Sequence, residues 1–234
     1  MSHESRSRCV THDSGGRKLH VDKSAVRAFL AQMQHPLQYL DFETFQTAVP
    51  MIQGTRPYQQ IPFQFSLHTV TEPGATPRHY GWIWEGQGNP FDAMLDELGG
   101  HLDERGSVVA YNASFETGRL HDAANVCPAK RAWVDSVVGR MVDLLVPFRA
   151  FHVCHPAQHG SASIKAVLPA LVGKDYSSLA ISEGGMANQA YLTAMYAGVP
   201  EEQKRQTFRD LEVYCGQDTL SMVDIVSRLC EVAV

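Results

Sequence analysis

The chain has 234 residues, with 25 Asp and Glu against 20 Lys and Arg, and so a formal net charge of −5. This length predicts one α/β domain whose core is large enough to be stable by itself. The acidic balance argues against a protein that coats long duplex DNA, but it permits an enzyme that holds a few nucleotides at the end of a strand.

Cysteine usage and hydropathy narrow the class of protein further. The five cysteines are odd in number and scattered, with no Cys-x-x-Cys pair, so the sequence predicts neither a disulfide framework nor a paired zinc ribbon. No apolar run approaches ~18 residues and there is no secretory signal pattern. We therefore expect a soluble cytoplasmic protein with no membrane association.

The N-terminal part divides into a tail and the start of the domain. Residues 1–17 are rich in Ser, Gly, Arg and His, which predicts a disordered tail, and residues 18–234 are expected to form a single domain. Asp22 can cap a helix, because it precedes a stripe of apolar residues at helical spacing. The members of that stripe are Val26, Phe29, Leu30 and Met33.

Three strands are expected in succession, followed by strands that alternate with helices. The predicted strands cover residues 37–42, 61–70, 79–84, 107–111 and 141–143. The predicted helices cover residues 90–103, from 113 onward, 163–171, 186–197 and 201–231, the last of which contains Gly216. This order favours a mixed sheet of about five strands that is flanked by helices.

Asp41-Phe42-Glu43 lies at the end of the first predicted strand. Two carboxylates separated by one residue point to the same side of an extended chain. Their mutual repulsion opposes burial, and a hard cation such as Mg²⁺ or Mn²⁺ would relieve it. Taken alone, the pair is better explained as a solvated strand end.

A second acidic motif is Asn112-Ala113-Ser114-Phe115-Glu116, at a strand-to-helix junction. Asn112 fits the N-cap of the helix, and Glu116 falls in its first turns. Glu116 shares a face with Leu120 and Ala124, at a spacing of four residues. By itself, this glutamate is also explained by the favourable helix dipole.

A third motif lies on the last predicted helix, where Tyr214 and Asp218 are one turn apart. Leu211, Tyr214, Cys215, Asp218 and Met222 form one stripe, which is apolar except for the Asp218 carboxylate and the Tyr214 hydroxyl. A carboxylate on such a stripe needs a partner, either inside the core or as a ligand. Gly216 either weakens this helix by about 1 kcal/mol or allows close packing against it.

Together the three motifs resemble the tyrosine-containing branch of the DEDD superfamily of 3′–5′ exonucleases, which have an RNase H-like fold. Several stretches look like a bacterial domain family of uncharacterised function within that superfamily, often found C-terminal to a RecB-like nuclease domain. These stretches are 40–45, 54–64, 111–116 and 155–158. Glu116 departs from the pattern, because most of the superfamily has Asp there.

The resemblance implies a hydrolase that uses two Mg²⁺ or Mn²⁺ ions on the 3′ end of DNA or RNA. Asp41, Glu43 and Asp218 would share one ion, Asp41 would bridge to the second, and Glu116 would support the second mainly through water. Tyr214 would orient the attacking water or help to deprotonate it. Orientation is the expected role, because an unperturbed tyrosine titrates near pH ~10, unless the metal lowers its pKa. A RecB-like nuclease or helicase on another chain is an expected partner, unless the chain acts alone.

Other polar residues are candidates for substrate contacts. Thr44 follows the acidic pair, and Arg56 lies beside Tyr58 and Gln60 in a loop where a phosphate and a stacked base could be held. Asn112 is a further candidate beside its capping role. Lys165 begins a helix after Ser163, where free amides can hold phosphate or the serine is a simple cap.

Two sets of residues have less specific interpretations. Asp143 ends the fifth strand and is expected to support the site, or to serve as a structural hydrogen-bond acceptor. His152, Cys154, His155 and His159 could bind zinc. No partner cluster accompanies them, so packing or a substrate contact is the expected role.

Two alternatives to the exonuclease remain open. The first is a nucleic-acid-binding module with the same fold and weak chemistry, supported by Glu116 and by the lack of a visible basic patch. The second is a hydrolase of short oligonucleotides or small nucleotides. The sequence does not decide between DNA and RNA, since the residue that would contact a 2′-hydroxyl cannot be placed.

Overall fold

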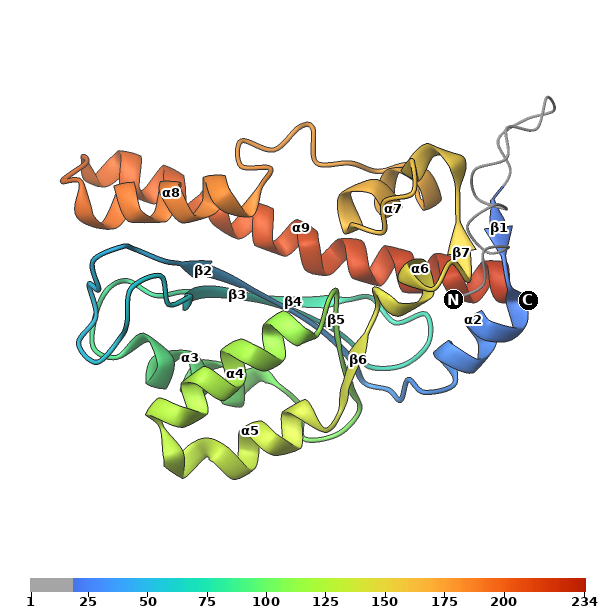
Figure 1. Ribbon diagram of the computed structural model, residues 1–234, viewed down its shortest axis with the longest axis horizontal. Coiled ribbons are helices and arrows are strands. Elements are labelled where there is room, and N and C mark those ends of the chain that lie inside the picture. The colour runs from blue at the N-terminus through green and yellow to red at the C-terminus, as the bar shows by residue number, and fades with distance from the viewer. Residues whose placement is uncertain (1–18) are drawn as a thin grey trace.

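The computed structural model describes residues 19–234, which form a five-stranded mixed sheet between two layers of helices (Figure 1). The strand order across the sheet is β4-β3-β2-β5-β6. The strands are β2 (Leu37–Phe45), β3 (Ile61–Val70), β4 (Arg78–Ile83), β5 (Ser107–Ala110) and β6 (Met141–Asp143). The α/β fold class and the sheet of five strands are therefore as predicted.

The direction of the strands follows from the connections between them. Loops without a helix join β2 to β3 (residues 46–60) and β3 to β4 (residues 71–77), and both pairs are antiparallel. Helical crossovers lead to β5 and β6, and β5 is parallel to both β2 and β6. The three consecutive strands on one side and the alternating part on the other give the RNase H-like arrangement, with β2 at its centre.

Helices cover both faces of the sheet (Figure 1). The long helix α9 and helix α8 pack on β2 and β3, and helices α3, α4 and α5 lie on the opposite side. The helices are α2 (Lys23–Leu30), α3 (Pro90–His101), α4 (Ser114–Val126), α5 (Arg131–Val138), α6 (Val146–Arg149), α7 (Ile164–Leu171), α8 (Gly184–Tyr196) and α9 (Glu201–Ala233).

The first predicted helix is present in the structure as α2. The Asp22 side chain accepts a hydrogen bond from the amide of Ala25 at 3.0 Å, and Val26 and Phe29 of α2 are buried. Helices α5 and α6 and a small sheet of β1 (His20–Val21) with β7 (Val153–Cys154) were not predicted. The predicted disordered tail, residues 1–17, lies outside the described residues.

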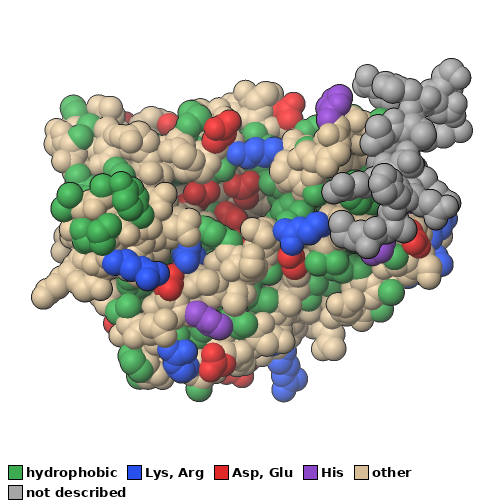
Figure 2. Space-filling model, in the orientation of Figure 1, with side chains coloured by type: hydrophobic (Ala, Val, Ile, Leu, Met, Phe, Trp, Pro, Cys, Tyr) green, Lys and Arg blue, Asp and Glu red, His purple; other side chains and the backbone are tan. Residues whose placement is uncertain are grey.

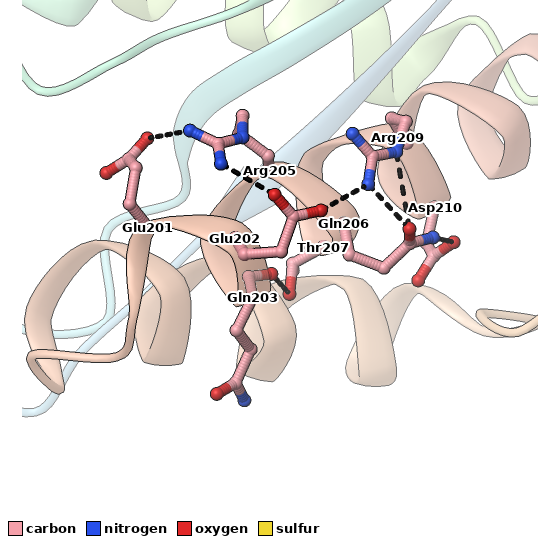
Figure 3. Close-up of polar contacts among 8 residues, drawn as sticks. All are labelled: Glu201, Glu202, Gln203, Arg205, Gln206, Thr207, Arg209 and Asp210. Atoms are coloured by element: carbon pink, nitrogen blue, oxygen red, sulfur yellow. Dashed lines mark hydrogen bonds and ion pairs between the residues drawn. The ribbon is translucent and has the colours of Figure 1, made fainter.

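Helix α9 runs without a break through Gly216. A methyl group at this position would lie 3.4 Å from Nε2 of His79 on β4, so the glycine allows the helix to lie close to the sheet. At the exposed start of α9, Glu202 pairs with Arg205 and Arg209 (Figure 3). Such exposed pairs stabilise a helix by only a few tenths of a kcal/mol each, so burial against the sheet is the main support for α9.

Polar side chains of β3 tie α9 to the sheet. The amide of Gln64 donates to the Leu211 carbonyl at 2.9 Å, and the Thr219 hydroxyl lies 2.7 Å from both Ser66 Oγ and His68 Nδ1. Polar and apolar residues alternate along β3, but every residue of the strand is buried, so its polar side chains do not reach solvent. These bonds fix the position of the helix that carries Asp218.

Candidate metal centre

Strand β2 carries the first two acidic residues of the candidate site. Asp41 and Glu43 lie opposite Ser66 and Gln64 of β3, and a bulge follows directly after Glu43. The parallel pairing with β5 covers only Leu37 to Tyr39. The acidic end of β2 therefore extends beyond β5, which leaves one side of the strand open to side chains from the helices.

Helix α9 brings the third carboxylate to this strand. Asp41, Glu43 and Asp218 each offer a carboxylate oxygen, and these oxygens lie within 4.8 Å of one another. Among residues 19–234 this is the one group of three or more His, Cys, Asp or Glu side chains with the spacing of a metal site. Cys215, one turn before Asp218, has its sulfur 3.6 Å from Asp41 Oδ2.

Glu116 supplies a fourth carboxylate from the first turn of α4. The side chain is only 2% exposed, and Oε2 has no hydrogen-bond partner within the described part of the chain. The Glu116 charge adds to the burial that raises the pKa of Asp41, and the Glu43 charge adds to the burial that raises the pKa of Glu116. The four carboxylates therefore act on one another. An unpaired buried carboxylate costs free energy unless a proton or a cation neutralises it.

The pKa values of all four acids are raised, with burial as the largest cause. Burial raises the pKa of Glu43 and of Glu116 to about 8, and that of Asp218 to about 6. The pKa of Asp41 lies well above its usual range, because the other three carboxylates add to the effect of burial. The site thus holds protons that a divalent cation would displace.

Tyr214 and Lys165, two of the candidate residues, border the acidic group. Tyr214 is buried one turn before Asp218, and its hydrogen bond lowers the pKa of that acid. The Lys165 amine lies 3.5 Å from the Tyr214 hydroxyl, and it also donates to the carbonyl of Ser182. Its positive charge lowers the pKa values of Glu43 and Asp218.

Tyr176 is a part of the site that sequence reasoning missed. Its hydroxyl donates to Asp218 Oδ1 at 2.7 Å, and the residue is 5% exposed. The Lys165 amine lies 5.6 Å from the centre of its ring. No sequence pattern indicated this role, because Tyr176 lies in an irregular segment and bonds to a residue 42 positions away.

The predicted N-cap at Asn112 is wrong. Asn112 has a left-handed backbone, with φ of 72°, and α4 begins after Ala113 without a side-chain cap. Asparagine tolerates this conformation, and its Oδ1 accepts hydrogen bonds from Ser114 and Arg149. Asp143 supports the same turn, because its Oδ1 accepts from the amides of Asn112 and Leu145.

The end of β2 and the loop that follows it contain the remaining candidate residues. Thr44 of β2 is half-buried just after the bulge, whereas Arg56 and Tyr58 of the loop are exposed. Gln60 accepts a hydrogen bond from Arg119 of α4, three residues after Glu116. Of these residues, Gln60 is the one with a side-chain contact to an element of the acidic site.

Ser163 and the histidines of residues 152–159, which lie before α7, were also candidate residues. Ser163 precedes the helix but makes no side-chain cap, so the simple capping role is wrong. His155 accepts from the amide of Ala157 and caps a short 3₁₀-helix, η2 (Pro156–Gln158). The histidines of this stretch are not brought together with other ligands, since the described residues give just the acidic group as a metal-binding arrangement.

Figure 2 shows how charged side chains are distributed on one face of the molecule. Acidic side chains gather in a hollow near the middle of the molecule, and Lys and Arg side chains lie around it (Figure 2). Hard carboxylate oxygens at short mutual distance suit Mg²⁺ or Mn²⁺, and the unpartnered oxygen of Glu116 is consistent with a further ligand. The residues present therefore fit a site for divalent cations.

The fold and the site define an α/β protein with a mixed five-stranded sheet and a cluster of four carboxylates, three of which are buried. The chain belongs to the family described as "Domain of unknown function (DUF2779)", whose model matches residues 38–163. The matched part includes Asp41, Glu43 and Glu116, and it ends before the helix that carries Asp218.

Three curated proteins are similar to this chain. Identity is 28% to "Uncharacterized protein MG366 homolog" of Mycoplasma pneumoniae and 26% to "Uncharacterized protein MG366" of Mycoplasma genitalium, each over 80% of this chain. It is 22% to "Uncharacterized protein UU173" of Ureaplasma parvum, over 89% of this chain. The matches cover 31–33% of the relatives, so the chain spans about a third of their length. No solved structure matches.

None of the helices between residues 19 and 234 combines the length and the apolar character needed to cross a bilayer.

Proposed function

We propose that this protein is a divalent-metal-dependent 3′–5′ exonuclease of the DEDD superfamily, which hydrolyses phosphodiester bonds of DNA or RNA. The observation that carries the proposal is the convergence of Asp41, Glu43, Asp218 and Glu116, which come from β2, α9 and α4. Glu43, Glu116 and Asp218 are buried and Asp41 is half-buried, and carboxylates gathered in this way are costly without cations. Their order and the adjacent Tyr214 are those of the tyrosine-containing branch.

The carboxylates would hold two Mg²⁺ or Mn²⁺ ions. Asp41, Glu43 and Asp218 form the tighter group and would bind the first ion. Asp41 would also bind the second, which Glu116 would support mainly through water. Bound cations would neutralise the charge that develops on a phosphodiester and on the attacking and leaving oxygens during hydrolysis. The additional methylene of Glu116 compared with Asp lets this side chain reach the group from α4.

Tyr214 would act by orientation. Burial and the neighbouring carboxylates raise the pKa of Tyr214, so its phenol stays protonated at neutral pH. A protonated phenol can hold an attacking water by a hydrogen bond but cannot accept its proton. The Lys165 amine, 3.5 Å from this hydroxyl, would contact a phosphate oxygen of the substrate.

The proposal places the substrate's 3′ end in the hollow between β2, α4 and α9. Arg56 and Tyr58, exposed in the loop after β2, would contact the strand as it leaves the hollow. The reaction would take place in the cytoplasm. A RecB-like nuclease or helicase on another chain is the proposed protein partner.

Hydrolysis of 5′-labelled single-stranded DNA and RNA with Mn²⁺ or Mg²⁺ tests the proposal. The expected result is a ladder that shortens from the 3′ end and disappears in chelator. Asp41→Asn is the inactive comparison. Glu104→Gln, which changes an exposed glutamate between α3 and β5, is the matched control and should keep full activity.

The other outcomes select among the alternatives. Binding of a labelled strand without cleavage when metal is supplied would favour a nucleic-acid-binding module. Cleavage of dinucleotides in preference to longer strands would favour a hydrolase of short oligonucleotides. Cleavage that persists unchanged in Asp41→Asn would show that the acidic cluster is not the active site.

A further inference from the structure

The chain between α7 and α8, residues 172–183, passes beside the acidic site and is attached to it at several points. We refer to this segment as the strap. Near its start, Lys174 forms an ion pair with Asp224 of α9 at 2.7 Å. Near its end, the Ser182 carbonyl accepts from Lys165. A methyl group on Gly184, the first residue after the strap, would lie 3.7 Å from Glu43 Oε2.

Tyr176 is the strap residue that contacts a carboxylate of the site. Its hydroxyl donates to Asp218 Oδ1 at 2.7 Å and lies 3.3 Å from Ser221 Oγ, one turn further along α9. Its ring meets the Tyr214 ring edge-on, with centroids 6.4 Å apart. Asp218 therefore has a phenol on either side, one from its own helix and one from the strap.

We infer that Tyr176 is a positioning residue, which holds the Asp218 carboxylate in the orientation needed to bind a divalent cation. The inference concerns the metal centre on which the proposed function rests, but it does not depend on which substrate is hydrolysed.

The physical basis is that a carboxylate on a helix can rotate about two side-chain bonds. A hydrogen bond from a buried phenol to one oxygen removes most of that freedom and leaves the remaining lone pairs for a cation. The bond therefore reduces the conformational freedom that Asp218 would lose when it binds a cation.

A purely structural role would not require this partner. Tyr191, which is also fully buried, donates to the backbone carbonyl of Trp84 at 2.9 Å, as a tyrosine that only fills the core can do. Tyr176 instead donates to a carboxylate that lies within 4.8 Å of two others. The two tyrosines thus provide a matched comparison, in which one buried phenol contacts the acidic site and the other does not.

Mn²⁺ binding by the full chain, measured by titration calorimetry, tests the inference without any nucleic acid. Tyr176→Phe removes the hydroxyl and keeps the ring. Loss of a hydrogen bond that orients a metal ligand typically weakens metal binding by about 10–100-fold, so we expect a change in Kd in this range. Tyr191→Phe should bind Mn²⁺ as the wild type does, although both variants lose one buried hydroxyl and should melt at similar, lowered temperatures.

The hydrolysis rate provides a second measurement. With Tyr176→Phe, the Mn²⁺ concentration for half-maximal rate should rise by the same factor as Kd, and the rate at saturating Mn²⁺ should recover. Unchanged Mn²⁺ affinity in Tyr176→Phe, or an equal loss in Tyr191→Phe, would overturn the inference, as would absence of Mn²⁺ binding by the wild type. If Tyr176→Phe weakens Mn²⁺ binding but the wild type cleaves no strand, the inference about Tyr176 is upheld. Only the proposed exonuclease function is then contradicted.

Discussion

Replacing Glu116 by Gln should change how the stability of the metal-free protein depends on pH. Glu116 is 2% exposed with an unpartnered Oε2, and burial raises its pKa to about 8. In the unfolded chain a glutamate titrates near ~4.3. Between these two pH values the folded state keeps a proton that the unfolded state has released, so the free energy of unfolding falls as pH rises.

The size of the effect follows from the width of this window. One group contributes a slope of up to ~1.4 kcal/mol per pH unit, which amounts to at most about 5 kcal/mol between pH ~4 and pH ~8. The contribution is complete below the window and is lost above it. Glu43 titrates in the same range and shares protons with Glu116, so the measured difference should be a fraction of this limit.

Urea unfolding in chelator, repeated from pH 5 to pH 9, measures the effect. Glu116→Gln should unfold with a shallower pH dependence than the wild type, and the gap between the two curves should widen toward pH 9. Glu104→Gln, at an exposed position, should follow the wild type. Parallel curves for Glu116→Gln and the wild type would refute the assignment of Glu116 as a buried carboxyl of this site.

Three further predictions concern the metal centre. Asp41→Asn or Asp218→Asn should abolish metal-dependent hydrolysis and leave the circular dichroism spectrum unchanged. The metal-free stability of either variant should be equal to or higher than that of the wild type, because like charges repel less. Full activity in either variant would disprove the metal assignment. Tyr214→Phe should lower the rate at saturating substrate and spare Mn²⁺ affinity in calorimetry, and an unaltered rate would remove Tyr214 from the mechanism. Mn²⁺ should bind more tightly at pH 8 than at pH 6, because it displaces protons from Glu43 and Asp218. The pKa values of these two acids are about 8 and about 6. Equal affinity at the two pH values, measured by calorimetry, would contradict them.

Short-range features of the site could be predicted from the sequence. Asp41 and Glu43 face the same way because side chains alternate along a strand, and Tyr214 lies beside Asp218 because they are one helical turn apart. The burial of Glu116 with its apolar stripe follows from the same geometry. In each case the spacing along the chain fixes the spacing in space.

Other features could not be predicted, because they depend on segments that meet only in the folded protein. Polar and apolar residues alternate along β3, yet the whole strand is buried, because α9 packs over it and supplies hydrogen-bond partners. Asn112 was expected to cap α4, but the turn after β5 takes a left-handed conformation that Asp143 stabilises from the neighbouring strand. The local pattern was compatible with both outcomes.

The sequence by itself thus determined which strand and which helices carry the acidic residues, since periodicity is a local property of the chain. The tertiary structure alone decided that these residues meet, and that Tyr176 completes the surroundings of Asp218 from 42 positions away. The physical reason is that an irregular segment such as the strap has no periodicity, so its contacts are set by the elements against which it packs.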